Sequence, residues 1–302
     1  MDFHITKRYH IMKGENMNRL QSDGAQAATK TKKMSILASN PVMRRLEKVD
    51  EHDEVNYATY GGILGKTIFF MVMTIAGIVL RFSLAGILAP EGASTITLNI
   101  KSFEFTMTTG EIIALIAAVI LGIGFQLLAF FAKPTTPVTG ALYCITQGYF
   151  ISFLIFKVLS GYEYLGALAL ALTLLIVLIM AILYTTGVIK VNKKFRMVML
   201  TLFIGAVSIS LLTTIAYFIP FTRGIVQSIT ANLPLSIIVT VIFIIIAALF
   251  LVSDFAVIDM VVTQQYPKKY EWQAAFGLSF TILWLYLKVL DLLMTIFGGK
   301  SK

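Results

Sequence analysis

Charged residues are scarce in this chain. Only 14% of its 302 residues are charged, whereas 57% are hydrophobic; soluble domains carry about 25% charged residues. Beyond residue 60 the chain holds only 15 Lys or Arg and 8 Asp or Glu. Such a composition leaves too few polar groups to cover a water-exposed surface, so we expect a membrane protein in contact with a lipid bilayer.

Histidine and cysteine are also nearly absent. The only histidines, His4, His10 and His52, precede the first long apolar run, and Cys144 is the single cysteine. An imidazole or thiolate cluster therefore cannot form inside the membrane, which argues against zinc proteases, haem proteins and Ser-His catalysis. We expect no enzyme activity, no cofactor and no certain metal site. A lone cysteine also excludes an internal disulfide.

Proline is missing from the interior of the apolar runs. About 20 apolar residues cross a hydrocarbon core roughly 30 Å thick. All seven prolines lie outside or at the edges of the runs that are this long, as helices require. The sequence thus predicts an all-α membrane protein with seven transmembrane helices, at Ile63 to Leu84, Glu111 to Phe131, Val138 to Leu159, Gly166 to Val188, Met197 to Ile219, Leu235 to Val257 and Ala274 to Phe297.

The basic residues gather in alternate loops, which predicts the orientation of the chain in the cell membrane. Ten of the 25 Lys and Arg precede residue 61, and another basic group spans residues 190–196. Because cytoplasmic loops are rich in Lys and Arg, we expect a cytoplasmic N-terminus, and we explain the net charge of +9 without nucleic-acid binding. Residues 1–60 would form a partly disordered cytoplasmic arm and residues 61–302 the seven-helix domain. A re-entrant last segment would return the C-terminus to the cytoplasm.

Two aspartates stand near the end of the sixth predicted span. Asp254 lies 19 residues beyond Leu235, and Asp259 follows five residues later, about 7.5 Å further along a helix axis. Five residues at about 100° each turn the two side chains roughly 140° apart, onto different faces. A charged residue at the bilayer centre costs about 2.5–3.5 kcal/mol on insertion scales. We predict that both aspartates sense ions or protons; the alternative is a pair of helix-end residues that reach water.

Other polar residues in the predicted spans have two interpretations each. Glu271 would return to the same membrane side as Asp254 and Asp259, so that three carboxylates could share protons or hold a divalent cation; alternatively, it only favours the start of its helix. Lys288 and Asp291 could form an ion pair, or they could lie on a permeation route. Gln147 and Gly148 could take part in an interhelical hydrogen bond, or they could line a cavity.

Five segments resemble one known family. They are residues 39–46, 59–67, 141–152, 183–196 and 253–287, the last of which includes the motifs SDFAVID, YEWQAAFGL and WLYL. In this order they are similar to the Bax inhibitor-1 superfamily, also called the transmembrane Bax inhibitor motif proteins, and to its bacterial YccA-like branch. The resemblance implies seven helices with the last one in the centre, in a bacterial inner membrane, and a calcium leak that is controlled by pH.

The resemblance also implies roles for particular residues. In relatives, the pH control is attributed to one aspartate on the sixth helix and one on the seventh. Asp254 matches the first of these, whereas this chain has Lys288 at the position of the second. Gln147 stands where relatives often have glutamate. Because of these departures, Asp254 can pair with Lys288, or Asp259 or Glu271 can supply the second carboxylate.

The sequence leaves three hypotheses for the function of the protein. The leading one is a pH-sensitive cation leak channel or transporter, with Ca²⁺ as the transported ion rather than a cofactor. The alternative is a regulatory membrane protein that binds a membrane protease or a stress-response complex through its N-terminal arm. An intramembrane aspartyl protease fits poorly, because Asp254 and Asp259 share one helix and no Gly-Xaa-Gly-Asp sequence is present.

Overall fold

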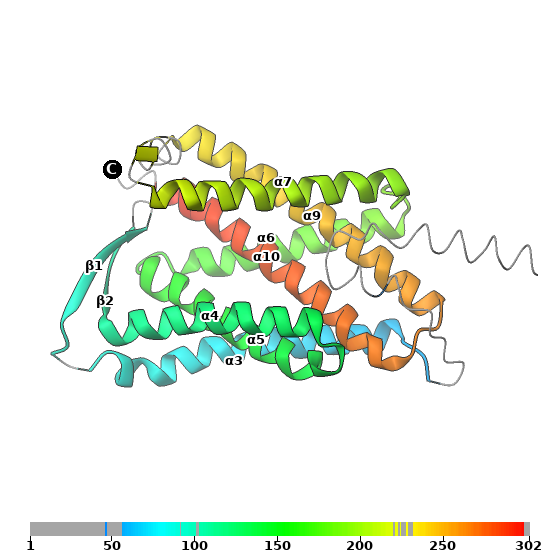
Figure 1. Ribbon diagram of the computed structural model, residues 1–302, viewed down its shortest axis with the longest axis horizontal. Coiled ribbons are helices and arrows are strands. Elements are labelled where there is room, and N and C mark those ends of the chain that lie inside the picture. The colour runs from blue at the N-terminus through cyan, green and yellow to red at the C-terminus, as the bar shows by residue number, and fades with distance from the viewer. Residues whose placement is uncertain are drawn as a thin grey trace, which may run out of the picture.

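The protein is a bundle of long helices with one β-hairpin at its end (Figure 1). The computed structural model describes residue 46 and residues 56–90, 92–100, 103–219, 221–222, 224, 228 and 232–298. Its elements are α3 (Tyr60–Leu88), β1 (Thr95–Ile100), β2 (Phe103–Thr108), α4 (Thr109–Phe131), η1 (Lys133–Thr135), α5 (Thr136–Phe153), the π-helix η2 (Leu154–Val158), α6 (Tyr164–Thr185), α7 (Lys193–Phe218), α9 (Leu233–Thr263), η3 (Lys268–Tyr270) and α10 (Glu271–Gly298).

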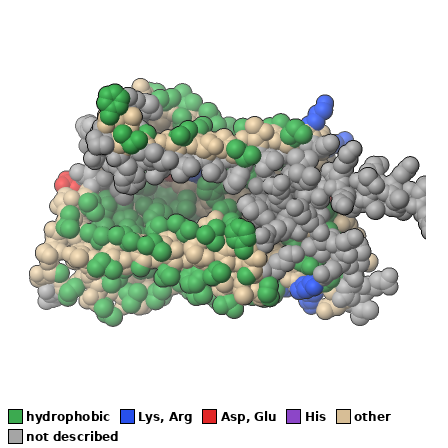
Figure 2. All heavy atoms as spheres, viewed as in Figure 1, with side chains coloured by type: hydrophobic (Ala, Val, Ile, Leu, Met, Phe, Trp, Pro, Cys, Tyr) green, Lys and Arg blue, Asp and Glu red, His purple; other side chains and the backbone are tan. Residues whose placement is uncertain are grey.

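Six segments in the described part of the chain are long and apolar enough to cross a membrane: Tyr60–Leu88, Thr109–Phe131, Thr136–Val158, Tyr164–Thr185, Leu233–Thr263 and Lys268–Phe297. The expected class, an all-α multi-pass membrane protein, is therefore confirmed. The fifth predicted span overlaps α7, which has 26 residues, and the total of seven spans stays a prediction. Hydrophobic side chains cover much of the described part of the face in Figure 2, and most of its visible Lys and Arg side chains lie at one end of the bundle.

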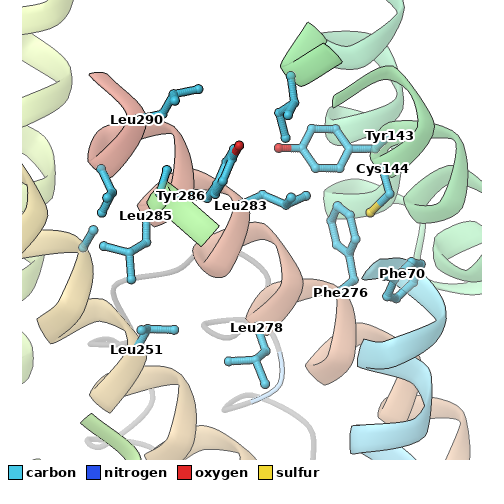
Figure 3. Close-up of a cluster of buried hydrophobic side chains, with 14 of the residues drawn as sticks. Phe70, Tyr143, Cys144, Leu251, Phe276, Leu278, Leu283, Leu285, Tyr286 and Leu290 are labelled. Atoms are coloured by element: carbon cyan, nitrogen blue, oxygen red, sulfur yellow. The ribbon is translucent and has the colours of Figure 1, made fainter. Parts of the chain in front are cut away.

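Helix α10 runs through the middle of the bundle, where it packs against α9, α3, α6 and α5 (Figure 1). Its Phe276 is fully buried among rings from α3 and α5 (Figure 3). The Phe276 ring lies 5.7 Å from the Phe70 ring and 5.6 Å from the Tyr143 ring, both edge to face. These ring contacts fix the first half of α10 against α3 and α5.

Glycines bring α3 and α5 into close contact. A Cβ atom added to Gly148 would lie 1.9 Å from the carbonyl oxygen of Thr74, and one added to Gly77 would lie 2.0 Å from that of Ile145. No side chain fits at either position, so the backbones touch as small residues permit in membrane helices. Gly148 therefore lies in a helix contact rather than in the wall of an open cavity.

Helix α9 is longer than the sequence analysis predicted. The sixth predicted span ended at Val257, but α9 continues to Thr263. Neither glycine nor proline interrupts residues 235–263, so the helix has no local reason to stop. Asp254 consequently lies nine residues before the end of α9, about 13.5 Å inside it, and is not a helix-end residue.

The β-hairpin between α3 and α4 was not predicted. Its antiparallel strands pair from Thr95 with Thr108 to Ile100 with Phe103. Along β2 the side chains of Phe103, Phe105 and Met107 are buried, whereas those between them are exposed. This alternation is typical of a strand with one packed face. The hairpin therefore covers the end of the bundle that α4 and η2 share.

Candidate functional site

Asp254 is fully buried between α9 and α10. Its exposed fraction is 0%, and its Oδ2 accepts a hydrogen bond of 2.5 Å from the Thr281 hydroxyl. Thr281 lies ten residues after the start of α10, about 15 Å along that helix. The carboxyl group is thus held deep in the contact between two membrane-spanning helices, by a side chain that the sequence analysis did not single out.

Asp259 contacts different helices from Asp254. It accepts a hydrogen bond from the Tyr60 hydroxyl of α3, and its Oδ2 lies 3.4 Å from the Tyr184 hydroxyl of α6. Helical geometry predicted that the two aspartates face apart, and these partners confirm it. Asp259 is only partly buried, so it joins three helices near the end of the bundle that carries the start of α3.

Glu271 is held by a basic side chain and by two further hydrogen bonds. Its side chain is 0% exposed and forms an ion pair with Lys66 of α3. Its Oε1 accepts hydrogen bonds of 2.9 Å from the Thr59 backbone N–H and 3.2 Å from the Thr59 hydroxyl. The Lys66 ammonium also lies 5.2 Å from the Trp272 ring centroid. These contacts tie the start of α10 to the start of α3.

The three carboxyl groups do not form the common cluster that was one of the two interpretations of Glu271. Within the described residues, no group of three or more His, Cys, Asp or Glu side chains could hold a metal ion. The physical reason is the helical turn between Asp254 and Asp259, which directs one toward α10 and the other toward α3 and α6. The third acid, Glu271, is drawn to Lys66.

Lys288 and Asp291 both reach from α10 to α9. The Lys288 ammonium lies 4.9 Å from the centroid of the Phe243 ring, within the range of a cation–π contact. Asp291 Oδ2 lies 3.5 Å from the Thr240 hydroxyl. The predicted pairs, Lys288 with Asp291 or with Asp254, are not among these contacts. Lys288 lies seven residues past Thr281, about 10.5 Å further along α10 than the level of Asp254.

Gln147 lies on α5 beside α4. A Cβ atom added to Gly122 of α4 would lie 3.6 Å from its Nε2 and 3.0 Å from the Thr146 hydroxyl. The small residue on α4 thus makes room for two polar side chains on α5. The side chain is partly buried, so Gln147 lies at a helix contact and its role stays a prediction.

A charged cluster at the opposite end of the bundle was missed. Glu111 Oε1 lies 2.9 Å from the Lys157 ammonium and 3.9 Å from the Arg81 guanidinium. Lys157 belongs to the π-helix η2 and also donates to the Thr106 carbonyl oxygen at 3.2 Å. Glu111 and Arg81, but not Lys157, also line a pocket of about 10 Å³ together with Tyr149, roughly the space of one water molecule.

One sequence signal could have located Glu111. The residues Thr108 to Glu111 read Thr-Thr-Gly-Glu, the capping-box pattern for a helix start. The structure has both bonds of this box, from the Glu111 N–H to the Thr108 hydroxyl and from the Thr108 N–H to Glu111 Oε2. No comparable signal in the sequence brings Arg81 and Lys157 to the same carboxylate, because they come from α3 and η2.

A known protein family matches this chain over most of its length. No curated protein and no solved structure gave a significant match to the chain. The family model described as Bax inhibitor 1 like matches residues 21–298. The match ends with α10 and includes Asp254, Asp259, Glu271 and Glu111. Since it spans most of the 302 residues, this multi-pass membrane protein belongs to the Bax inhibitor 1 like family.

Proposed function

We propose that the protein is a pH-sensitive leak pathway for cations, with Ca²⁺ as the transported ion, and that Asp254 is the group that controls it. The observation that carries this proposal is the position of Asp254, fully buried in the contact between α9 and the central helix α10. An ionisable side chain inside a membrane-spanning helix is costly, and such residues commonly mark ion pathways and proton relays.

The partner of Asp254 suits a change of protonation. The Thr281 hydroxyl donates to the carboxylate at 2.5 Å, and a hydroxyl group can also accept a hydrogen bond. The contact can therefore persist when the carboxyl group gains a proton, with the donor and acceptor exchanged. A charged Asp254 would attract a cation into the α9–α10 contact, and a protonated one would not.

Asp259 and Glu271 have different proposed roles. Asp259 is partly exposed at the same end of the bundle as the start of α3, so it is placed to attract cations toward the interior. Glu271 already has Lys66 as its counter-ion. We therefore assign Glu271 to anchoring α10 against α3 and leave the sensing role to Asp254 and Asp259.

The orientation of the pathway follows from the basic loops. Lys190, Lys268 and Lys269 lie at the end of the bundle where α3 and α10 begin, and the visible basic side chains in Figure 2 gather at one end. The positive-inside rule makes this end cytoplasmic. Ca²⁺ would then leave or reach the cytoplasm past Asp259 and Asp254, in a cell membrane of the bacterial type that the YccA-like resemblance implies.

Calcium flux in liposomes tests the proposal directly. The purified protein is reconstituted with a calcium indicator inside the vesicles, and flux is measured over a series of pH values. Wild-type protein should show flux that changes with pH, and Asp254→Asn should remove the pH dependence. Glu104→Gln, which removes an exposed carboxylate on β2, is the matched control and should behave as wild type.

Two outcomes would overturn the proposal. Wild-type protein that passes no Ca²⁺ at any pH would exclude the leak activity. Flux with an unchanged pH profile in Asp254→Asn would exclude Asp254 as the controlling group. A protein without flux that co-purifies with a membrane protease or stress-response complex, and loses it when residues 1–33 are deleted, would instead support the regulatory function.

A further inference from the structure

Four side-chain contacts follow one another along the line where α9 meets α10, which we name the α9–α10 seam. The first joins Asp254 to Thr281 at 2.5 Å. The second is the edge-to-face ring pair Phe250–Trp284, with centroids 5.8 Å apart. The third and fourth join Phe243 to Lys288 at 4.9 Å and Thr240 to Asp291 at 3.5 Å. The order runs backward on α9 and forward on α10, as in an antiparallel pair.

The spacing of these residues places them on one face of each helix. Those on α10 are separated by three, four and three residues, the spacing of a single helical stripe. Their ten-residue length corresponds to about 15 Å along the axis. The seam therefore leads from the buried Asp254 toward the end of the bundle where Glu111 lies.

Polar groups occupy both ends of this stretch of the seam. At the inner end are Asp254 and Thr281, and at the outer end are Lys288, Asp291 and Thr240. The outer side chains Lys288 and Asp291 are partly exposed, whereas Asp254 is fully buried. Two charged side chains on a membrane-spanning helix indicate contact with water or a polar route. The seam thus has a polar outer site and a polar inner site.

Only the Phe250–Trp284 pair lies between the two polar sites in this series of contacts. Phe250 is 4% exposed, and the two rings meet at 77°. Aromatic side chains each cover a large apolar area, and an apolar constriction between polar regions of a channel can keep water and ions out. Removing one ring would leave a gap in the apolar stretch between the two sites.

We infer that the α9–α10 seam is the route from the Glu111 end of the bundle to Asp254, and that the Phe250–Trp284 pair is the barrier on it. The inference deepens the proposed function, because it names the path by which cations would reach the controlling acid. Water access along the seam, however, can be measured without any calcium flux.

A cysteine reporter at Thr281 tests the barrier. Cys144 is the only cysteine and is buried, so Cys144→Ser provides a background without reactive thiols. In full-length protein in liposomes, Thr281→Cys is exposed to a cationic, membrane-impermeant methanethiosulfonate. Adding Trp284→Ala should raise its labelling rate about tenfold, the rate equivalent of losing one ring–ring contact. Trp284→Phe keeps a ring, so the labelling rate should stay near that of Thr281→Cys in the Cys144→Ser background without a change at Trp284.

Two further variants keep the test decisive. Phe82→Ala disrupts another edge-to-face pair, Phe82–Phe156, away from the seam, and should not change labelling. Phe250→Leu opens the same barrier from α9 and replaces Trp284→Ala if that variant does not fold. The inference would be overturned if the labelling rate does not change in Trp284→Ala or Phe250→Leu, or if it rises equally in Phe82→Ala.

The results also separate the inference from the proposed function. If wild-type protein passes no Ca²⁺ at any pH while labelling still depends on Trp284, the leak proposal fails and the barrier stands. If Ca²⁺ passes in a pH-dependent way but the labelling rate is the same with and without the changes at Trp284 and Phe250, the seam is not the route.

Discussion

At one end of the bundle a single lysine faces a single glutamate, whereas at the other end two basic side chains share one. Glu271 is completely buried with Lys66, whose side chain is 18% exposed. Glu111 is 10% exposed and lies between Arg81 and Lys157, the latter 29% exposed. The Lys66–Glu271 pair is neutral and nearly closed to water; the Glu111 cluster has one excess positive charge and partial contact with water.

This difference shows how charge can be used for anchoring. A buried pair gains stability only when its geometry satisfies both partners, and removal of one partner is more costly than the pair itself is worth. The Lys66–Glu271 pair, with its added Thr59 bonds, meets that condition and fixes α3 to α10. Glu111 instead joins three separate elements, α3, α4 and η2, through Arg81 and Lys157, and it lies beside a water-sized pocket.

Glu271→Gln should have the largest effect on stability. It leaves the Lys66 ammonium near the core without a counter-ion, so we expect a loss of about 3–5 kcal/mol in the free energy of unfolding. The measurement is thermal unfolding in detergent, followed by circular dichroism. The double variant Lys66→Met/Glu271→Leu should recover most of the loss, because it removes both charges.

Glu111→Gln should have a smaller effect. Glutamine can still form the capping box with Thr108, but the charged hydrogen bond to Lys157 is lost, which costs about 1.5–3 kcal/mol. The same unfolding measurement, with Glu104→Gln as the control, checks this value. A larger loss than in Glu271→Gln would reverse the ranking of the two ends.

Tyr60→Phe should have the smallest effect of the three. It removes one hydroxyl hydrogen bond to the partly exposed Asp259, and because Tyr60 itself is 52% exposed, water weakens this bond to about 0.5–1.5 kcal/mol. Tyr184→Phe is the matched control, because its hydroxyl lies 3.4 Å from the same carboxylate and should matter less. Equal losses from the two variants would show that the closer contact has no special weight.

The success of the sequence analysis depended on the range of the interactions. Apolar runs of sufficient length predicted the spans, because the bilayer thickness leaves few alternatives. The 140° turn between Asp254 and Asp259 followed from helix geometry alone. The interpretation in which the three carboxylates form one cluster was wrong, because it assumed that residues at one side of the membrane meet. Instead, Lys66 binds Glu271, and two tyrosines contact Asp259.

The sequence by itself determined that this is a membrane protein of helical spans with acids at Asp254, Asp259 and Glu271, because hydrophobicity and helical period are local properties. Only the tertiary structure decided that Thr281 faces Asp254, that Lys288 faces Phe243, and that Arg81 and Lys157 meet at Glu111. Each of these contacts joins different helices, and their register depends on how the whole bundle packs around α10.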